Sequence, residues 1–163
     1  MGLFSRRNKE EPSPGERGST DAAATVALPE GGRPVSSPLG TAERSRIAHG
    51  LEALRARAVD VDDLAALGAA YDRAFEAARS GVGETPADVV EQFGIAIGEY
   101  LARHSHRDWA VVTDVFGTDL GLVDARSDTV IVPHNLVSAR WMRGETGWIP
   151  GVVGHLVSLR PRA

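Results

Sequence analysis

Apolar and polar positions alternate most regularly in residues 109–133, where three apolar-rich runs are separated by Gly, Asp and Ser. In the first run every second residue, from Trp109 to Thr113, shares one face of an extended strand. The pattern predicts a three-stranded antiparallel meander with turns near Gly117 and at residues 125–128. Three strands with one apolar face need a helical layer over them, because a sheet this small is not stable alone.

A spacing of three to four residues between apolar side chains predicts two helices before the sheet. The first begins near Ala42, and the second follows an N-cap at Asp60 or Asp62 and ends at residues 80–83. Their apolar stripes consist of Ile47, Leu51, Leu54 and Ala58 in the first helix and Leu64, Leu67, Tyr71, Phe75 and Ala78 in the second.

A third helix has a complete set of start signals. Thr85 is the expected N-cap, Pro86 occupies the first helical position, and an acid follows in the first turn. Gly94 and Gly98 are one turn apart and leave a notch on the helix surface. We expect another element of the fold to pack into this notch, with a ligand as the less favoured occupant.

The chain after the meander permits two interpretations. Pro133 should end the third strand, and residues 136–143 then form either a short helix capped by Asn135 or a fourth, edge strand. Trp148 begins a final helix that runs to Leu159.

The expected fold class is α+β, with three N-terminal helices packed on a small antiparallel sheet of three to four strands and a C-terminal helix. Residues 1–40 are rich in Pro, Gly and Ser and almost free of periodic apolar residues, so we expect a disordered tail there. Residues 41–163 should form a single globular domain.

Composition restricts the functional classes. The absence of Cys excludes disulfides and thiolate chemistry and suits a reducing cytoplasm. Only one of the eighteen basic residues is Lys, and Ala and Gly are plentiful, a bias that indicates a GC-rich bacterial genome. No apolar run is long enough to span a bilayer, so we expect no stable membrane insertion. A net charge of −4 argues against nucleic acid as a partner. The acids concentrate in residues 41–133, with nine arginines against sixteen carboxylates, whereas residues 134–163 are basic.

Several positions together resemble a known family. They are Gly98-Glu99 followed by Leu101, Trp109, Val111-Val112, Asp114, Gly117, Asp119-Leu120, Pro133, Val137, Arg140 and Gly144-Glu145. This pattern, over about residues 62–158, resembles the bacterial domain-of-unknown-function family 3806. The resemblance implies a helical layer followed by a small sheet and a closing helix, and it implies no activity.

Two clusters have residue types that suit chemistry. His104 and His106 precede Asp108, a familiar ligand set for divalent metals, but a third ligand such as His134 or His155 would have to come from afar. The ordinary explanation is a polar helix end, where His favours the negative end of the dipole. The second cluster consists of the sheet aspartates Asp114, Asp119, Asp124 and Asp128, which suit either turn geometry or acid–base work.

Arg140, Trp141, Arg143 and Trp148 form the cluster that we assign to partner binding, because Trp and Arg dominate the energetic centres of interfaces. At least one of the two tryptophans is also a candidate for closing the hydrophobic core. The favoured function is a non-catalytic interaction or adaptor domain, with a protein partner or self-association. We assign no catalytic residue, metal or cofactor. The alternative is a small metal-dependent or hydrolytic enzyme that uses the His104/His106 region and the sheet aspartates.

Overall fold

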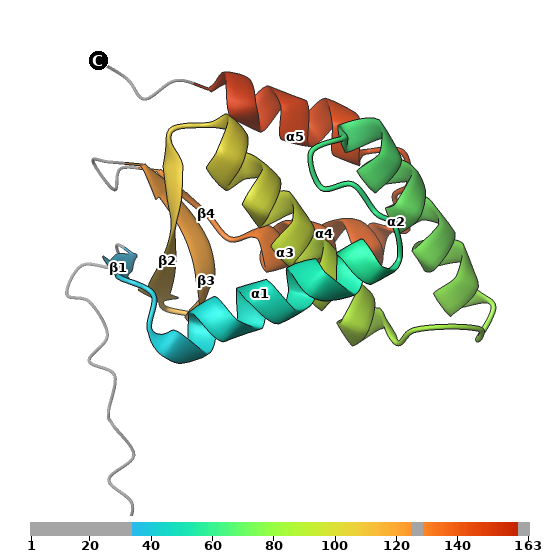
Figure 1. The fold of residues 1–163 in the computed structure, drawn as a ribbon, viewed down its shortest axis with the longest axis horizontal. Helices are drawn as coiled ribbons and strands as arrows, with labels where there is room; N and C mark the ends of the chain where they lie inside the picture. The colour runs from blue at the N-terminus through green and yellow to red at the C-terminus, as the bar shows by residue number, and fades with distance from the viewer. Residues whose placement is uncertain (1–33, 125–128, 160–163) are drawn as a thin grey trace, which may run out of the picture.

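The computed structural model describes residues 34–124 and 129–159, which form an α+β domain of five helices and a four-stranded antiparallel sheet. The helices are α1 (Thr41–Ala56), α2 (Leu64–Arg79), α3 (Pro86–His104), α4 (Pro133–Arg143) and α5 (Ile149–Ser158), and the strands are β1 (Val35–Ser37), β2 (Arg107–Asp114), β3 (Gly117–Asp124) and β4 (Val130–Ile131). Figure 1 shows the sheet at one end of the domain, with the helices extending from it.

The meander is confirmed over its first two strands. Strands β2 and β3 pair antiparallel along their whole length, with Trp109 opposite Leu122 and Asp114 opposite Gly117. The turn between them is therefore two residues long, and Gly117, which follows it, has a φ of 133° that only glycine adopts readily. Strand β4 contributes two residues at the edge of β3. The second predicted turn, at residues 125–128, lies outside the described residues.

The structure corrects one prediction at the sheet edges and decides one open choice in favour of the helix. Residues 35–37 of the predicted tail form β1, which pairs with β2 through Val35 and Thr113, so the folded part begins before Thr41. The rest of the predicted tail, residues 1–33, lies outside the described residues. The fourth strand is thus β1 and not residues 136–143, which belong to α4. Helix α4 begins at Pro133 after an N-cap at Val132, so Asn135 lies inside the helix and does not cap it.

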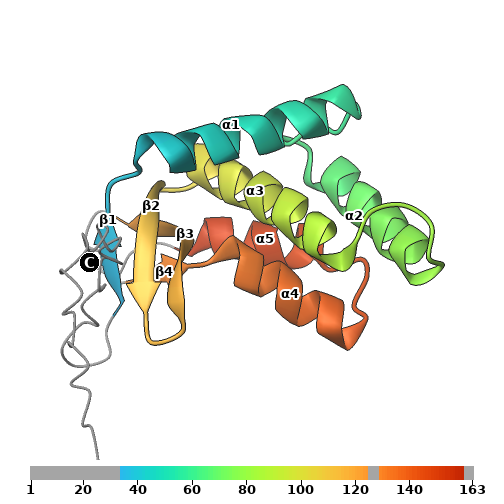
Figure 2. The same cartoon turned by 90° about the horizontal axis from the view of Figure 1, so that it is seen from below.

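Helix α3 runs through the middle of the domain, with α1 on one side and α4 on the other (Figures 1 and 2). It carries the largest share of the buried apolar residues and also contacts α2, α5, β2 and β3. The fully buried side chains of the main core cluster are Leu54, Leu67, Tyr71, Val89, Phe93, Ala96, Ile97, Leu101, Leu122, Val137, Ile149 and Val153. Ile47 of the first predicted stripe lies instead in a second, smaller cluster with Ile95 and Leu120. Ala58, the last residue of that stripe, lies beyond the end of α1 and is exposed, so the prediction was wrong there.

The notch on α3 is filled by two aromatic rings. A Cβ atom added at Gly98 would lie 2.0 Å from the indole of Trp109, and one at Gly94 would lie 2.5 Å from the imidazole of His134. Strand β2 and helix α4 thus approach α3 more closely than any larger residue would allow. This confirms the expectation that the notch serves packing.

The predicted start of α3 is also confirmed. Thr85 Oγ1 accepts a hydrogen bond from the backbone N–H of Asp88, and Asp88 Oδ2 accepts one from the backbone N–H of Thr85, which completes a capping box. The N-cap of α2 is Asp63, whose carboxylate accepts from two backbone N–H groups, so neither Asp60 nor Asp62 caps that helix.

The C-terminus of α1 leads to a first prediction. Ala58 has a φ of 55°, while the backbone N–H of Val59 donates to Leu54 and that of Ala58 donates to Arg55. This is a Schellman motif with alanine in the left-handed position that favours glycine. We expect Ala58→Gly to raise the free energy of unfolding by about 1 kcal/mol in urea titrations.

Helix α4 ends in the same motif, with Gly144 in the left-handed position at a φ of 67°. The reverse change, Gly144→Ala, should therefore lower the free energy of unfolding by about 1 kcal/mol. Equal signs for the two variants would contradict the assignment of strain to Ala58.

None of the helices in residues 34–124 and 129–159 combines the length and the apolar character that crossing a bilayer requires.

Candidate functional site

An open groove of about 480 Å³ lies between the start of α3 and the length of α4. Its floor and walls include residues from α1, α3, β3 and α4. The lining consists of Arg46, Pro86, Ala87, Val90, Glu91, Asp119, His134, Asn135, Ser138, Trp141 and Met142. One end of the groove is apolar and the other is charged.

The apolar end is built around Trp141. Its indole packs edge-on against Phe75 of α2, with ring centroids 4.8 Å apart, which holds the ring in place. The neighbouring Met142 is 80% exposed although it is a large apolar side chain. Val90 and Pro86 of α3 complete this wall. The groove therefore presents a rigid aromatic ring and an adaptable thioether to solvent.

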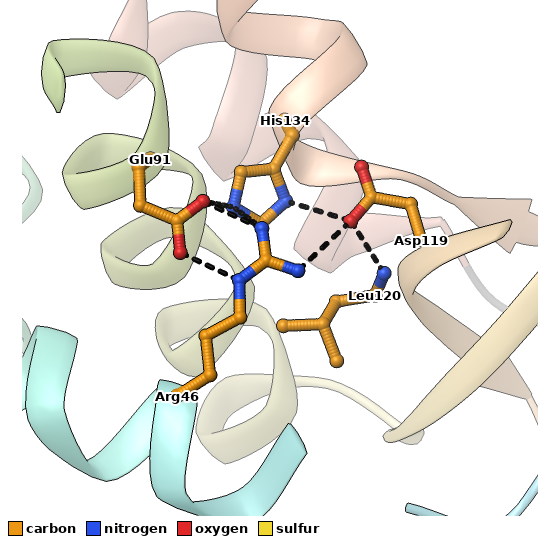
Figure 3. A network of polar contacts seen from close by, with 5 residues as sticks. All are labelled: Arg46, Glu91, Asp119, Leu120 and His134. Carbon is orange, nitrogen blue, oxygen red and sulfur yellow. Dashed lines mark hydrogen bonds and ion pairs between the residues drawn. The ribbon is translucent and has the colours of Figure 1, made fainter. Parts of the chain in front are cut away.

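The charged end is a network that joins four elements of the fold (Figure 3). Arg46 of α1 grips the Glu91 carboxylate of α3 with two hydrogen bonds, Nε to Oε1 at 2.6 Å and Nη2 to Oε2 at 2.5 Å. The third guanidinium nitrogen, Nη1, reaches Asp119 Oδ1 of β3 at 3.3 Å. The same Oδ1 accepts the backbone N–H of Leu120 at 2.7 Å. The bidentate pair of Arg46 and Glu91 fixes the orientation of both side chains.

His134 is the buried member of this network, with 5% of its surface exposed. Its Nε2 lies 3.2 Å from Glu91 Oε2 and 3.5 Å from Arg46 Nη2, and its Nδ1 lies 3.8 Å from Asp119 Oδ1. Nδ1 is buried and has no hydrogen-bond partner in the described part of the chain. The ring is held because it fills the notch at Gly94.

The electrostatics of the network favour a neutral imidazole between charged neighbours. Burial lowers the pKa of His134, and this outweighs the opposing effect of Asp119 and Glu91. The hydrogen bond from Arg46 holds the pKa of the Glu91 carboxyl below its usual range, and the same contact raises the pKa of Arg46. The pair Arg46–Glu91 therefore stays ionised at neutral pH while His134 stays uncharged.

These shifts predict a pH dependence of stability. The folded state prefers neutral His134, whereas the unfolded chain binds a proton near pH 6.5, so stability falls as the pH drops below about 6.5 towards the lowered pKa in the folded state. The slope from this residue is at most roughly 1.4 kcal/mol per pH unit. Urea titrations between pH 7.5 and 5.5 should show this fall in the free energy of unfolding, and the substitution His134→Gln should reduce its dependence on pH. Glu91 contributes to stability in a different pH range. Its pKa is lowered in the folded state, so its contribution to stability is lost only when the pH falls below about 4.3. An unchanged slope in His134→Gln would assign the effect to other groups.

A second, smaller cavity of about 140 Å³ lies beside the groove and shares Asp119 and Asn135 with it. It extends to the tip of the β2–β3 hairpin, where Phe116 is 92% exposed. Asp114, which lines this cavity, accepts the backbone N–H of Phe116 at 2.7 Å.

The histidines predicted as metal ligands lie away from the groove. His104 Nε2 is 2.9 Å from Asp62 Oδ1, and its ring packs 4.3 Å from that of Tyr100. His106 lines a separate surface cavity beside α5. The structure places His134, one of the two proposed third ligands, in the groove network instead. In residues 34–124 and 129–159, no three His, Asp or Glu side chains are arranged to hold a metal ion.

The sheet aspartates have separate positions. Asp114 forms the turn interaction described above, and Asp119 belongs to the groove network. Asp124 is buried opposite Arg107, whose Nη1 donates to the backbone carbonyl of Leu156. Asp128 lies outside the described residues. The structure therefore brings one sheet aspartate, Asp119, next to a histidine.

The four residues assigned to partner binding divide into two groups. Trp148 is 7% exposed and packs edge-on against Tyr71 at 5.6 Å, so it closes the core and is not a surface anchor. Arg140 stacks over Trp148 at 5.7 Å and pairs with Glu145 at 2.9 Å. Trp141 lines the groove, and Arg143 has 64% of its side chain exposed.

The sequence interpretation missed Arg46 and Glu91 as members of a site. Each lies on the polar side of a helix with an ordinary amphipathic pattern, and 45 residues separate them. The signal in the sequence that pointed to this site was Gly94. A glycine on a helix surface leaves a notch that a side chain of another element must fill, and here the imidazole of His134 fills it.

The domain is thus an α+β unit in which a helical layer covers a small sheet, the class that the sequence resemblance implied. The family described as Domain of unknown function (DUF3806) matches residues 71–151, and the chain belongs to this family. The matched stretch includes Glu91, Asp119, His134 and Trp141, whereas Arg46 precedes it. No curated protein and no solved structure matches the chain.

Proposed function

We propose that the chain is a non-catalytic interaction or adaptor domain that binds a protein partner in the groove between α3 and α4. The observation that supports this most directly is the apolar end of the groove, where Met142 is 80% exposed beside the half-buried Trp141. Exposed apolar side chains around a fixed aromatic ring are typical of binding surfaces, because the ring is ordered before the partner arrives.

We place this activity in the cytoplasm of a bacterium. Support comes from the complete absence of Cys, which suits a reducing compartment. The net charge of −4 favours a protein partner over nucleic acid.

Photo-crosslinking in cells tests the proposal. A photoreactive residue in place of Met142 should capture one or a few specific proteins. A matched control replaces Val82, which is 68% exposed at the turn before α3 and does not line the groove. We expect capture from position 142 and none from position 82. Equal labelling from both positions, or none from either, would contradict the proposed surface.

Hydrolysis is a second candidate function, favoured by one feature of the groove. A neutral imidazole beside a carboxylate can act as a general base, and His134 lies within 3.8 Å of Asp119 while the hydroxyl residue Ser138 lines the same groove. If this function is correct, the protein should hydrolyse an activated ester such as p-nitrophenyl acetate, and His134→Gln should abolish the turnover. Ester turnover that is the same in both proteins would rule out His134 as the base.

A further inference from the structure

The groove and the smaller cavity adjoin each other, because Asp119 and Asn135 line both of them. We refer to the two together as the trough. The trough runs from Phe116 at the hairpin tip, past the charged network, to Met142 at the end of α4. Its two ends carry the two most exposed large apolar side chains of the described residues, at 92% and 80%.

The middle of the trough has an excess of negative charge. Three carboxylates line it, those of Glu91, Asp114 and Asp119, and Arg46 is the one cation among its lining residues. Glu91 engages two of the guanidinium nitrogens of Arg46, which leaves Asp119 with the longer contact at 3.3 Å. Asp119 is thus incompletely neutralised, and its side chain is 35% exposed.

His134 does not supply the missing positive charge. Its ring is buried against Gly94, and its Nδ1 faces Asp119 Oδ1 across 3.8 Å without a hydrogen bond. The contacts that the described residues make to Asp119 all use Oδ1, from Arg46, His134 and the backbone of Leu120. The other carboxylate oxygen, Oδ2, remains available for a cation that enters from solvent.

We propose that the trough binds an extended segment of a partner protein in which an Arg or Lys is flanked by apolar side chains. The cation lies against Asp119 and Asp114, and the apolar side chains contact Trp141 and Met142 at one end and Phe116 at the other. A cation between two acids gains a charge-assisted hydrogen bond, and the apolar flanks exclude water from it. An anionic membrane or a nucleic acid would meet three carboxylates and be repelled. This inference rests on the proposed function of the groove and specifies the chemistry of its partner.

Fluorescence anisotropy with defined peptides and the full chain tests this. The probe is a labelled nonapeptide with Arg at its centre, Phe and Leu two residues to either side, and Gly and Ser elsewhere. A second peptide carries Gln and a third carries Glu in place of the Arg. We expect the Arg peptide to bind at least about tenfold more tightly than the Gln peptide, and the Glu peptide more weakly still. Raising the salt concentration should weaken the binding of the Arg peptide alone, because counterions screen the charge pair.

Two substitutions locate the contact. Asp119→Asn should reduce affinity for the Arg peptide by about tenfold and leave the Gln peptide unaffected, because an amide oxygen can still accept the Leu120 N–H. Asp108→Asn, at an exposed position of β2 that does not line the trough, should change neither. Thermal melts of both variants verify that the fold is retained.

Several outcomes would overturn the inference. Equal binding of the Arg, Gln and Glu peptides would show an apolar site without charge recognition. Failure of all three to bind, with specific crosslinking from position 142, would leave the proposed function standing and reject this partner chemistry. If changing Arg6, Arg7 and Lys9 to Ser raised the affinity for the Arg peptide about tenfold, the trough would be occupied by the chain's own N-terminal segment and not by a partner.

Discussion

Trp148→Ala should lower the free energy of unfolding by about 3–5 kcal/mol, because it removes a buried aromatic side chain and leaves a cavity that its neighbours cannot fill. The edge-on contact with Tyr71 and the stacking of Arg140 over the ring are lost with it. Urea titrations followed by circular dichroism at 222 nm would measure the change.

Trp141→Ala is the matched comparison, since it removes the same side chain from a half-buried position. We expect a loss of about 2 kcal/mol, from the Phe75 contact and the smaller buried area. The two variants should separate stability from binding, with Trp141→Ala impairing crosslinking from position 142 while the domain stays folded. A stable Trp148→Ala domain that no longer crosslinks would instead restore Trp148 to the partner surface.

Gly98→Ala should have the second large effect, a loss of about 3 kcal/mol in the free energy of unfolding. The new Cβ would lie 2.0 Å from Cη2 and 2.3 Å from Cζ2 of Trp109, so the ring or the strand that carries it must move. The ring cannot turn aside freely, because its Nε1 donates a hydrogen bond to Glu99 Oε2 at 3.1 Å. Helix α3 and strand β2 would be forced apart where they pack against each other.

Gly154→Ala provides the control in the middle of α5. Its added Cβ would meet only Leu64 at 3.9 Å, an ordinary contact, so the substitution should raise stability by about 0.5–1 kcal/mol through helix propensity alone. The double change Gly98→Ala with Trp109→Leu should recover part of the loss. If Gly98→Ala were neutral, the close approach of Trp109 to α3 would be wrong.

The elements that the sequence predicted well are those with a strong local signal. The start of helix α3 was expected from an N-cap at Thr85, a proline at the first helical position and an acid in the first turn, and all three are local properties of the chain. The β2–β3 hairpin followed from alternation around a short turn. Strand β1 was missed because a strand of three residues with one half-buried side chain is too short to show an alternating apolar pattern. It is held by pairing with β2, which lies more than 70 residues further along the chain. The apolar spacing in residues 136–143 was compatible with both a helix and a strand, because the segment is short. In the structure this segment is helical and packs against α3.

The candidate site was largely outside the reach of the sequence. Arg46, Glu91, Asp119 and His134 come from four separate elements, and each has an ordinary local explanation as a surface charge, a turn acid or a helix start. Trp141 was assigned to partner binding because aromatic side chains outside a periodic stripe are unusual, and it lines the groove. Trp148 was selected by the same argument, but it lies at the start of a helix whose apolar face turns it into the core.

The central position of α3 has a consequence for hydrogen exchange. Because this helix contacts the other four helices and the two long strands, no partial opening can expose its middle turns without separating several layers at once. The amides of Phe93 to Leu101 should therefore exchange with deuterium only through global unfolding. Strand β1 is attached through a single neighbour and can open alone, so its amides should exchange much earlier. Among the residues that the structure describes, strand β1 would then be one of the first backbone segments that a protease could cut.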